Sequence, residues 1–341
     1  MRGETSGRAA PRVIVSASLA YDYIMSFPGS FKDHILPDKA HVLSVSFLVD
    51  SLRRQRGGVG GNIAYNLALL GEPAAVVGAA GPDFAEYRAI FDGLGIDTQL
   101  VPEVADQLTA YAFMMTDLAG NQIAAFYPGA LDRASDVDTI EAASRAVLGL
   151  VGATAPDAMR RHAAEIAGSG CRLVYDPSQQ VVALPAEDIK AGVDAAWAVI
   201  GNDYELAMIA QKTGLTVDAI AERVSLVAVT FGEQGSELRQ GGEIVKIPAA
   251  PPDPLADPTG GGDAYRAGLL KGLLLGLELP VVGRMAALVA TYAIERHGTQ
   301  EHVFTPEEFV ARFDGAFPDF AGTISADQFV SGHGVPITTT H

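Results

Sequence analysis

The chain has 341 residues, of which 48% are hydrophobic and 19% are charged, a balance typical of a folded globular protein rather than a membrane-embedded one. Acidic residues outnumber basic ones by 41 to 24, and the net charge of −17 argues against binding to nucleic acid or to anionic membranes. The single cysteine, Cys171, excludes an intramolecular disulfide and multi-cysteine metal sites, and it favours a cytoplasmic location.

Strand-like apolar runs alternate with helical patterns between two polar tails. We expect a disordered tail at 1–10, one folded unit over 11–330 and a flexible tail at 331–341. This alternation predicts an α/β fold with a largely parallel sheet and crossover helices. In chain order the expected elements are a strand at 13–18, a helix from Gly61, a strand at 74–77, a helix near 84–94, a strand at 146–151, a helix from Pro156, strands at 172–175, 196–200 (with a helix after it) and 226–230, and buried helices at 269–277 and 285–294.

Two pairs of additional strand-like segments interrupt this alternation. The first pair is 23–27 with 41–49, and the second is 108–116 with 122–127, which Gly120-Asn121 joins as a hairpin turn. Strands inserted in this way predict a small second sheet, from about 20–55 and 107–128. It would form a lid over the carboxyl edge of the main sheet, where open α/β sheets bind ligands. Extra edge strands without a lid function are the alternative.

A glycine-rich turn at 257–263 opens into a long apolar helix. The unpaired amides of Gly260, Gly261 and Gly262 predict an anion hole that suits a phosphoryl group. Asp263 stands at the mouth of this hole, where a carboxylate is useful for accepting a proton, as an aspartate does in phosphoryl transfer. The alternative is that Asp263 only caps its helix. The chain has no P-loop, no complete dinucleotide-binding fingerprint and no His-Glu-x-x-His zinc helix.

The 257–263 turn and the glycine-rich segment 56–62 together resemble the paired signatures of the ribokinase-like (PfkB) sugar and nucleoside kinases. The similarity runs from about Val13 to about Glu301. The resemblance implies a ribokinase-like three-layer α/β fold with a mostly parallel central sheet and a small β-sheet lid. Segments that resemble the bacterial adenosine kinase branch in particular are 26–29, 46–50, 121–123, 126–130, 176–180 and 298–301.

The resemblance also implies an enzyme that uses ATP and Mg²⁺ to phosphorylate the 5′-hydroxyl of a nucleoside, with adenosine in purine salvage as the leading candidate. A requirement for a monovalent cation such as K⁺ is left open. Asp263 is then the base that takes the hydroxyl proton, and Asp22 is the carboxylate that accepts hydrogen bonds from the ribose hydroxyls. From the residues alone, a turn-forming role for Asp22 is the alternative. The other implied substrate-binding residues are Ser18, Gly58, Asn62, Ser46 and Gln179.

For the nucleotide, the resemblance implies that Asn202, Thr230, Gly232 and Gly235 contact ATP. Glu205 is expected to organise Mg²⁺ through water, because a hard cation prefers oxygen ligands. From the residues alone, Asn202 and Glu205 also fit a helix capping box, and 230–235 fits a strand followed by a turn. Ser46 resembles a lid residue that reaches the partner's pocket, so a homodimer through the lid strands is implied.

Two departures from the branch leave the substrate open. Ala112 stands on a lid strand where the branch usually has phenylalanine, and its neighbours Tyr111 and Phe113 point to the other face. The branch also tends to carry an arginine soon after Gln180, whereas this chain has no cation there before Lys190. Two alternatives therefore remain, namely a sugar kinase of ribose or fructose type and a non-catalytic nucleoside-binding sensor.

Overall fold

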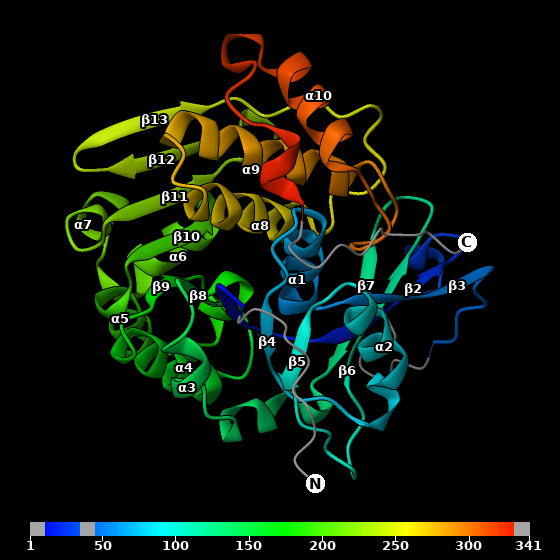
Figure 1. Ribbon diagram of the computed structural model, residues 1–341. Helices are drawn as coiled ribbons and strands as arrows, with labels where there is room; N and C mark the ends of the chain where they lie inside the picture. The colour runs from blue at the N-terminus through cyan, green and yellow to red at the C-terminus, as the bar shows by residue number, and fades with distance from the viewer. Residues whose placement is uncertain (1–10, 35–44, 331–341) are drawn as a thin grey trace, which may run out of the picture.

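The computed structural model describes residues 11–34 and 45–330. The predicted tails, and residues 41–44 of one predicted lid strand, lie outside the described residues. Figure 1 shows a large sheet with helices on both faces and a smaller sheet beside it. Within the two described ranges, every helix is too short or too polar to cross a membrane.

The large sheet has nine strands in the order β13-β12-β11-β10-β9-β8-β1-β4-β5. All pairs from β11 to β5 are parallel, and β12 and β13 add an antiparallel hairpin at one edge. The parallel strands bring their carboxyl ends to one edge, where ligand sites of such sheets form. The strands are β1 (Val13–Ser16), β4 (Ala75–Val77), β5 (Asp97–Leu100), β8 (Leu148–Val151), β9 (Arg172–Tyr175), β10 (Ala198–Asn202), β11 (Leu226–Thr230), β12 (Ser236–Gln240) and β13 (Glu243–Ile247).

Alternate strand residues face two different helical layers. Val13 and Val15 pack in a core with the first layer, whereas Ile14 belongs to the core of the second. The first layer holds α1 (Val59–Leu69), α8 (Gly261–Leu274) and α9 (Leu279–Ile294), flanked by α2 (Ala85–Gly93) and α10 (Pro306–Ala316). The second layer holds α3 (Ile140–Ala143), α4 (Pro156–Gly168), α5 (Ala186–Ala195), α6 (Asp203–Thr213) and α7 (Val217–Ala221) (Figure 1). The expected parallel sheet with crossover helices is thus confirmed.

Short 3-10 helices occur in the connections. They are η1 (Phe31–Asp33), η3 (Pro82–Phe84), η4 (Gly129–Asp136), η5 (Ser178–Val182), η6 (Gly232–Gln234), η7 (Pro318–Phe320) and η8 (Ala326–Phe329).

The small sheet has the order β3-β2-β6-β7, with β2 (Ala20–Ser26), β3 (Ser51–Gly57), β6 (Ala110–Thr116) and β7 (Gln122–Tyr127). The predicted second sheet is confirmed, but the strand expected at 41–49 is wrong in its described part. Residues 45–49 form no strand, and Phe47 packs on Phe27 and Phe31 instead. The strand lies further on, in a polar stretch that includes Arg53 and Arg54, because an edge strand tolerates charged side chains.

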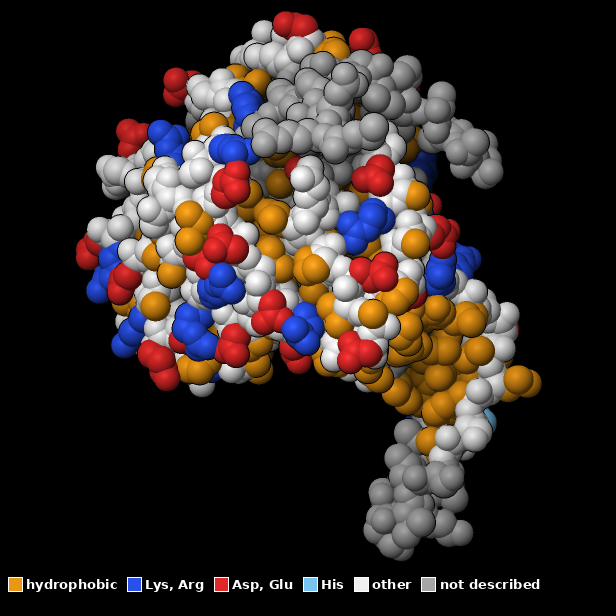
Figure 2. Space-filling model, turned by 60° about the horizontal axis from the view of Figure 1, so that its bottom comes forward, with side chains coloured by type: hydrophobic (Ala, Val, Ile, Leu, Met, Phe, Trp, Pro, Cys, Tyr) orange, Lys and Arg blue, Asp and Glu red, His pale blue; other side chains and the backbone are white. Residues whose placement is uncertain are grey.

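The pairing register gives this sheet, which we call the lid, two different faces. Asp22 lies in one row with Gln55, Ala112 and Phe126, so these four side chains share a face. Aromatic rings that pack against one another line the opposite face. The lower right of Figure 2 shows hydrophobic side chains gathered over the lid. The exposed ones on the aromatic face are Leu52, Phe113, Ile123 and Tyr127.

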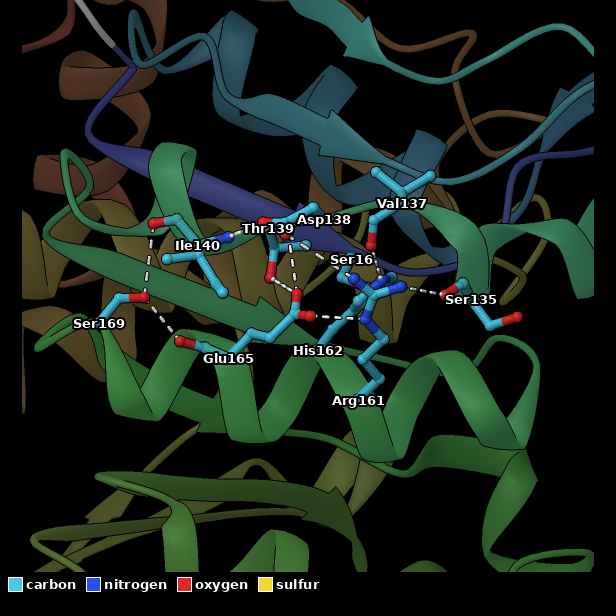
Figure 3. A network of polar contacts seen from close by, with 10 residues as sticks. All are labelled: Ser16, Ser135, Val137, Asp138, Thr139, Ile140, Arg161, His162, Glu165 and Ser169. Atoms are coloured by element: carbon cyan, nitrogen blue, oxygen red, sulfur yellow. Dashed lines mark hydrogen bonds and ion pairs between the residues drawn. The ribbon is translucent and has the colours of Figure 1, made fainter.

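A buried histidine joins three segments on the face covered by α4 (Figure 3). His162 Nε2 donates to the carbonyl oxygen of Val137 at 3.1 Å, so Nδ1 accepts from the hydroxyl of Ser16 at 2.7 Å. Burial lowers the pKa of His162, which keeps the ring neutral at neutral pH. Ser16 is 1% exposed and His162 is fully buried, so this pair is a core contact and not a nucleophile with its base.

Candidate active site

Asp22 presents an available carboxylate on the lid. It lies within β2, so the alternative of a turn-forming aspartate is wrong. Its carboxylate fills the space beside Gly57, where a Cβ atom would overlap its oxygens. Among the residues that the structure describes, no group donates a hydrogen bond to Asp22, and burial raises its pKa to about 6. The carboxylate is therefore free to accept hydrogen bonds from a ligand.

The start of α1 is fixed by two of the predicted substrate-binding residues. Gly58 has φ of 84°, and a Cβ atom there would approach the carbonyl oxygen of Ser18 to 2.5 Å, so only glycine fits. Ser18 Oγ accepts a hydrogen bond from Val59 N at 3.0 Å. These contacts set the direction in which α1 presents Asn62, one turn further on.

Asp263 lies in the first turn of α8, but it does not cap the helix. The N-cap is Gly260, with φ of 82° and no side-chain cap. The Asp263 carboxylate instead accepts from Asn62 Nδ2 at 2.8 Å. Burial raises the pKa of Asp263 to about 6, against the opposing effects of Arg266 and the Asn62 hydrogen bond. A carboxylate with a raised pKa is well matched to accepting a proton.

The amides at the start of α8 are available to an anion. Gly261 N donates to the carbonyl oxygen of Pro258 at 3.3 Å, and the first helical bond runs from Ala264 N to Gly260 O at 2.9 Å. The amides of Gly262 and Asp263 precede that bond and have no helical partner. The positive end of the helix dipole adds to this preference for negative charge.

Arg266 supplies a buried cation beside this turn. Its guanidinium pairs with Asp176 through two nitrogens, one of them at 2.8 Å, and Nη2 lies 3.6 Å from Glu205 Oε2. Arg266 Nη1 lies 2.7 Å from where a Cβ atom on Gly262 would be. Sequence reasoning missed this residue, because it sought the cation only after Gln180. The signal was an arginine one turn after Asp263 on a mostly apolar helix.

Asn202 and Glu205 form the capping box that the residues alone suggested. Glu205 N donates to Asn202 Oδ1 at 2.7 Å, and Asn202 N donates to Glu205 Oε2 at 2.8 Å. Burial raises the pKa of Glu205. Over 11–34 and 45–330 there is no cluster of three acidic, histidine or cysteine side chains that would hold a metal directly. The expected role of Glu205 toward Mg²⁺ stays a prediction.

The predicted nucleotide element begins where β11 ends. Thr230 is the last residue of β11, and Phe231 N donates to Gly235 O at 2.8 Å to close the turn that contains Gly232. The local structure is the strand and turn that the residues alone indicated. This turn follows the carboxyl end of β11, and Asn202 ends the neighbouring parallel strand, so both lie at the same edge of the sheet.

Two predicted site residues stand apart from this group. Ser46 is exposed in the segment before β3, and Gln179 is exposed in η5. In the described part of the chain, neither side chain hydrogen-bonds to another predicted site residue. Their expected roles stay predictions.

Asn62 connects Asp263 to a buried glutamine that sequence reasoning also missed. Gln300 is 2% exposed, and its Nε2 donates to Asn62 Oδ1 at 3.0 Å and to the hydroxyl of Tyr87. The only signal in the sequence was the resemblance of 298–301 to the adenosine kinase branch, which gave Gln300 no role.

Tyr87 connects Gln300 to the lid. Its hydroxyl donates to the carbonyl oxygen of Gly57 at 3.1 Å, and the Asp22 carboxylate lies against Gly57. Asp22 and Asp263 are therefore connected through one continuous set of buried contacts between the lid and α8.

Comparison with known proteins agrees with this arrangement. Residues 23–306 match the pfkB family of carbohydrate kinases. The nucleoside kinase of Methanothermobacter thermautotrophicus is 32% identical over 298 residues, which cover 86% of this chain and 93% of that protein. The structure of Burkholderia thailandensis nucleoside kinase in complex with inosine aligns with a TM-score of 0.81 at 36% identity, covering 90% of this chain and 98% of that one.

A second structure of the Burkholderia thailandensis kinase, in complex with ADP-inosine, aligns with a TM-score of 0.78 at 37% identity and covers 90% of this chain and 96% of that one. The predicted ribokinase-like fold with a small separate sheet is confirmed. The family match spans most of the chain, and the protein is therefore a phosphotransferase that belongs to the pfkB family of carbohydrate kinases.

Proposed function

We propose that this kinase transfers the γ-phosphoryl group of ATP to the 5′-hydroxyl of a nucleoside. The observation that carries the proposal is the pair of carboxylates, Asp22 and Asp263, at the two ends of one buried network. A ribose has vicinal hydroxyls at one end and its 5′-hydroxyl at the other, so it suits two separated carboxylates. The similarity to a nucleoside kinase solved with inosine and with ADP-inosine supports the same substrate class and the use of ATP.

In this proposal, Asp263 accepts the proton of the nucleoside 5′-hydroxyl while the 5′-oxygen attacks the γ-phosphorus of ATP. The bond between the γ-phosphorus and the oxygen of the departing ADP breaks in the same step. The amides of Gly260, Gly261 and Gly262 hold the charge that develops on the transferred group, and the Gly261 amide exchanges its 3.3 Å hydrogen bond with Pro258 for that contact. Arg266 adds a fixed positive charge beside them. Asp22 accepts hydrogen bonds from the ribose 2′- and 3′-hydroxyls, and Ser18, Gly58 and Asn62 border the ribose.

Asn202, Thr230, Gly232 and Gly235 are proposed to border the ATP at the carboxyl ends of β10 and β11. Glu205 is proposed to hold Mg²⁺ through water, and the ion supplies neutralisation of the phosphate charges.

The lid offers an aromatic ring for the base despite Ala112. Phe126 lies in the same row as Asp22 and Ala112, on the same face, and 56% of it is exposed. The small side chain of Ala112 lies between the carboxylate and the ring in this row. We therefore propose that Phe126 stacks on the base, which favours a nucleoside over a free sugar.

Phe126→Ala is expected to raise KM for nucleoside by about ten- to a hundredfold, the loss expected for one base-aromatic stack. Steady-state kinetics with inosine and adenosine measures this effect. Tyr127→Ala is the matched control, because that ring points to the opposite face of β7 and stacks on Tyr111. Equal effects of the two changes would remove Phe126 from the base site.

The pH dependence follows from the two raised pKa values. Asp263 must be ionised to accept a proton, and Asp22 must be ionised to bind two hydroxyls, and the pKa of each is about 6. We expect kcat/KM to rise as the pH increases through about 6 and to level off above it, instead of rising near the ordinary aspartate value of about 4. A profile already flat from pH 5 upward would contradict this assignment.

The substrate class is tested by measuring ADP formation with adenosine, inosine, guanosine, ribose and fructose. Nucleosides are expected to give the higher kcat/KM, with adenosine as the leading candidate for purine salvage. Faster turnover of ribose or fructose would select the sugar kinase alternative, which Ala112 favours. Tight nucleoside binding without ADP from any acceptor would select a non-catalytic sensor.

We also propose that the chain forms a homodimer through the aromatic face of the lid. The exposed apolar residues Leu52, Phe113, Ile123 and Tyr127 support this, since large exposed apolar patches mark interaction sites. Sedimentation velocity distinguishes the dimer from the monomer. A cytoplasmic location is proposed from the single cysteine.

A further inference from the structure

The buried network runs from Gly57 through Tyr87, Gln300 and Asn62 to Asp263. The donor and the acceptor of each hydrogen bond in it follow from the two end groups, which can only accept. The carbonyl oxygen of Gly57 can only accept, so the Tyr87 hydroxyl donates to it and its oxygen is left to accept. The group of Gln300 that faces Tyr87 must then be the donor Nε2. Its remaining hydrogen meets Asn62, which must present Oδ1.

This polarity fixes the other end of the Asn62 side chain. With Oδ1 directed at Gln300, Nδ2 is directed at Asp263, where it donates at 2.8 Å to the carboxylate. If the Asn62 amide turned over, an oxygen would face the Asp263 carboxylate and an NH₂ would face another NH₂. Both contacts would be unfavourable, so Gln300 decides which atom of Asn62 meets the base.

The burial of Gln300 is hard to explain by packing alone. Its Nε2 makes two hydrogen bonds, whereas its Oε1 is buried and has no partner among the described residues. An unpaired buried carbonyl is unfavourable, and a nonpolar side chain of similar size would avoid it. Among the described residues, Gln300 therefore hydrogen-bonds to its neighbours only through its donor group.

Neighbouring contacts hold Gln300 firmly in place. On one side, Thr299 Oγ1 donates to the carbonyl oxygen of Arg56 at 3.0 Å, at the end of lid strand β3. On the other side, Tyr65 of α1 donates from its hydroxyl to the carbonyl oxygen of His302 at 2.6 Å. The segment around Gln300 thus bridges the lid and α1, the helix that carries Asn62.

We propose that Gln300 is a positioning residue that orients the amide of Asn62 and so directs Asn62 Nδ2 at the Asp263 carboxylate. This inference rests on the proposed role of Asp263 as the base. Gln300 itself touches neither Asp263 nor, in this proposal, the reacting atoms.

Gln300→Glu is the sharpest test, because a carboxylate accepts but cannot donate to Asn62 Oδ1. The Asn62 amide should then turn its Nδ2 toward the new carboxylate and away from Asp263. We expect kcat to fall by about ten- to a hundredfold, with KM for ATP unchanged and the acid limb of kcat/KM moved to higher pH. Gln211→Glu, an exposed change of the same kind on α6, is the control and should leave all three unaltered.

A titration of Asp263 separates positioning from the mere addition of charge. The midpoint is measured by ¹³C NMR of the labelled carboxyl, assigned by its loss in Asp263→Asn, for Gln300→Glu alone and in an Asn62→Ala background. Gln300→Glu should raise the Asp263 midpoint in both backgrounds. The rise should be larger by about one pH unit when Asn62 is present than in the Asn62→Ala background, because only then is one charge-assisted hydrogen bond to Asp263 lost. Equal rises in the two backgrounds would overturn the proposal, because the new charge alone would then explain the effect.

The titration needs no substrate, so it also separates this inference from the proposed function. If the wild-type chain phosphorylates no nucleoside and the rises still differ, the proposed function fails and the positioning role stands. If the wild type is active and the rises are equal, the positioning role fails alone.

Discussion

Replacing Asp263 with asparagine is expected to lower kcat by about 10³- to 10⁴-fold while nucleoside affinity stays within a fewfold of wild type. An amide cannot accept the hydroxyl proton, but its oxygen can still accept from Asn62 Nδ2, so the pocket keeps its shape. ADP formation measures kcat, and calorimetry measures the affinity. Retention of more than about a tenth of kcat, outside the range for loss of a catalytic base, would show that another group takes the proton.

The same change is expected to stabilise the protein at neutral pH. The folded pKa of Asp263, about 6, lies above the ordinary value of 3.8, so the folded state binds the proton more tightly. Ionisation of Asp263 therefore lowers the free energy of unfolding, and this decrease reaches its full size at pH values above 6. Asp263→Asn should raise the free energy of unfolding by about 1 kcal/mol at pH 7.5. Asp253→Asn, at an exposed position in the connection between β13 and α8, is the control and should change the free energy of unfolding little.

Replacing Arg266 with methionine is expected to lower the free energy of unfolding by about 3–5 kcal/mol, the usual loss when one partner of a buried ion pair is removed. Asp176 is fully buried and accepts two hydrogen bonds from Arg266, so the change leaves an unpaired buried carboxylate. Turnover should fall as well, because the fixed positive charge beside α8 is lost. Urea unfolding measures the stability.

Two further variants identify the cause of that loss. Arg266→Met with Asp176→Leu removes both charges and should recover a large part of the stability. Arg145→Met breaks an exposed pair with Glu141, whose side chains are 62% and 81% exposed, and should change it by less than about 1 kcal/mol. A double variant no more stable than Arg266→Met alone would contradict the explanation from an unpaired charge.

The large sheet was predictable because its parallel strands are buried on both faces and appear as short apolar runs. The elements that sequence reasoning missed are those without such runs. The hairpin of β12 and β13 contains Arg239, Lys246 and two glutamates, and one of its strands is an edge. Strand β3 is mostly polar for the same reason. Their strand conformation comes from pairing with neighbours, which no local pattern records.

The candidate site was predictable where a residue type and its local setting both carry information. Asp263 after three glycines was identified in this way, whereas Asn62 was identified from the resemblance to the ribokinase-like kinases. The structure brings the two side chains into contact. Arg266, Tyr87 and Gln300 were missed because their partners are distant in sequence. Gln300 meets Asn62 across 238 positions, and Arg266 meets Asp176 across 90.

Other residues have contacts that the sequence left undecided. Asn202 and Glu205 were given both a nucleotide role and a capping role, and the capping box is present. Ser18 and Gly58 were assigned to the substrate, and in the structure they fix the start of α1. A residue can shape a helix start and border a ligand at once, so these contacts leave the predicted substrate roles untested.

The most direct measurement is a crystal structure of the protein with inosine and a non-hydrolysable ATP analogue. We predict that the nucleoside 5′-oxygen lies about 3 Å from the Asp263 carboxylate, within hydrogen-bond reach, while the 2′- and 3′-oxygens are bound by Asp22. A nucleoside bound with its 5′-oxygen remote from Asp263, or with its ribose hydroxyls away from Asp22, would contradict the proposed function.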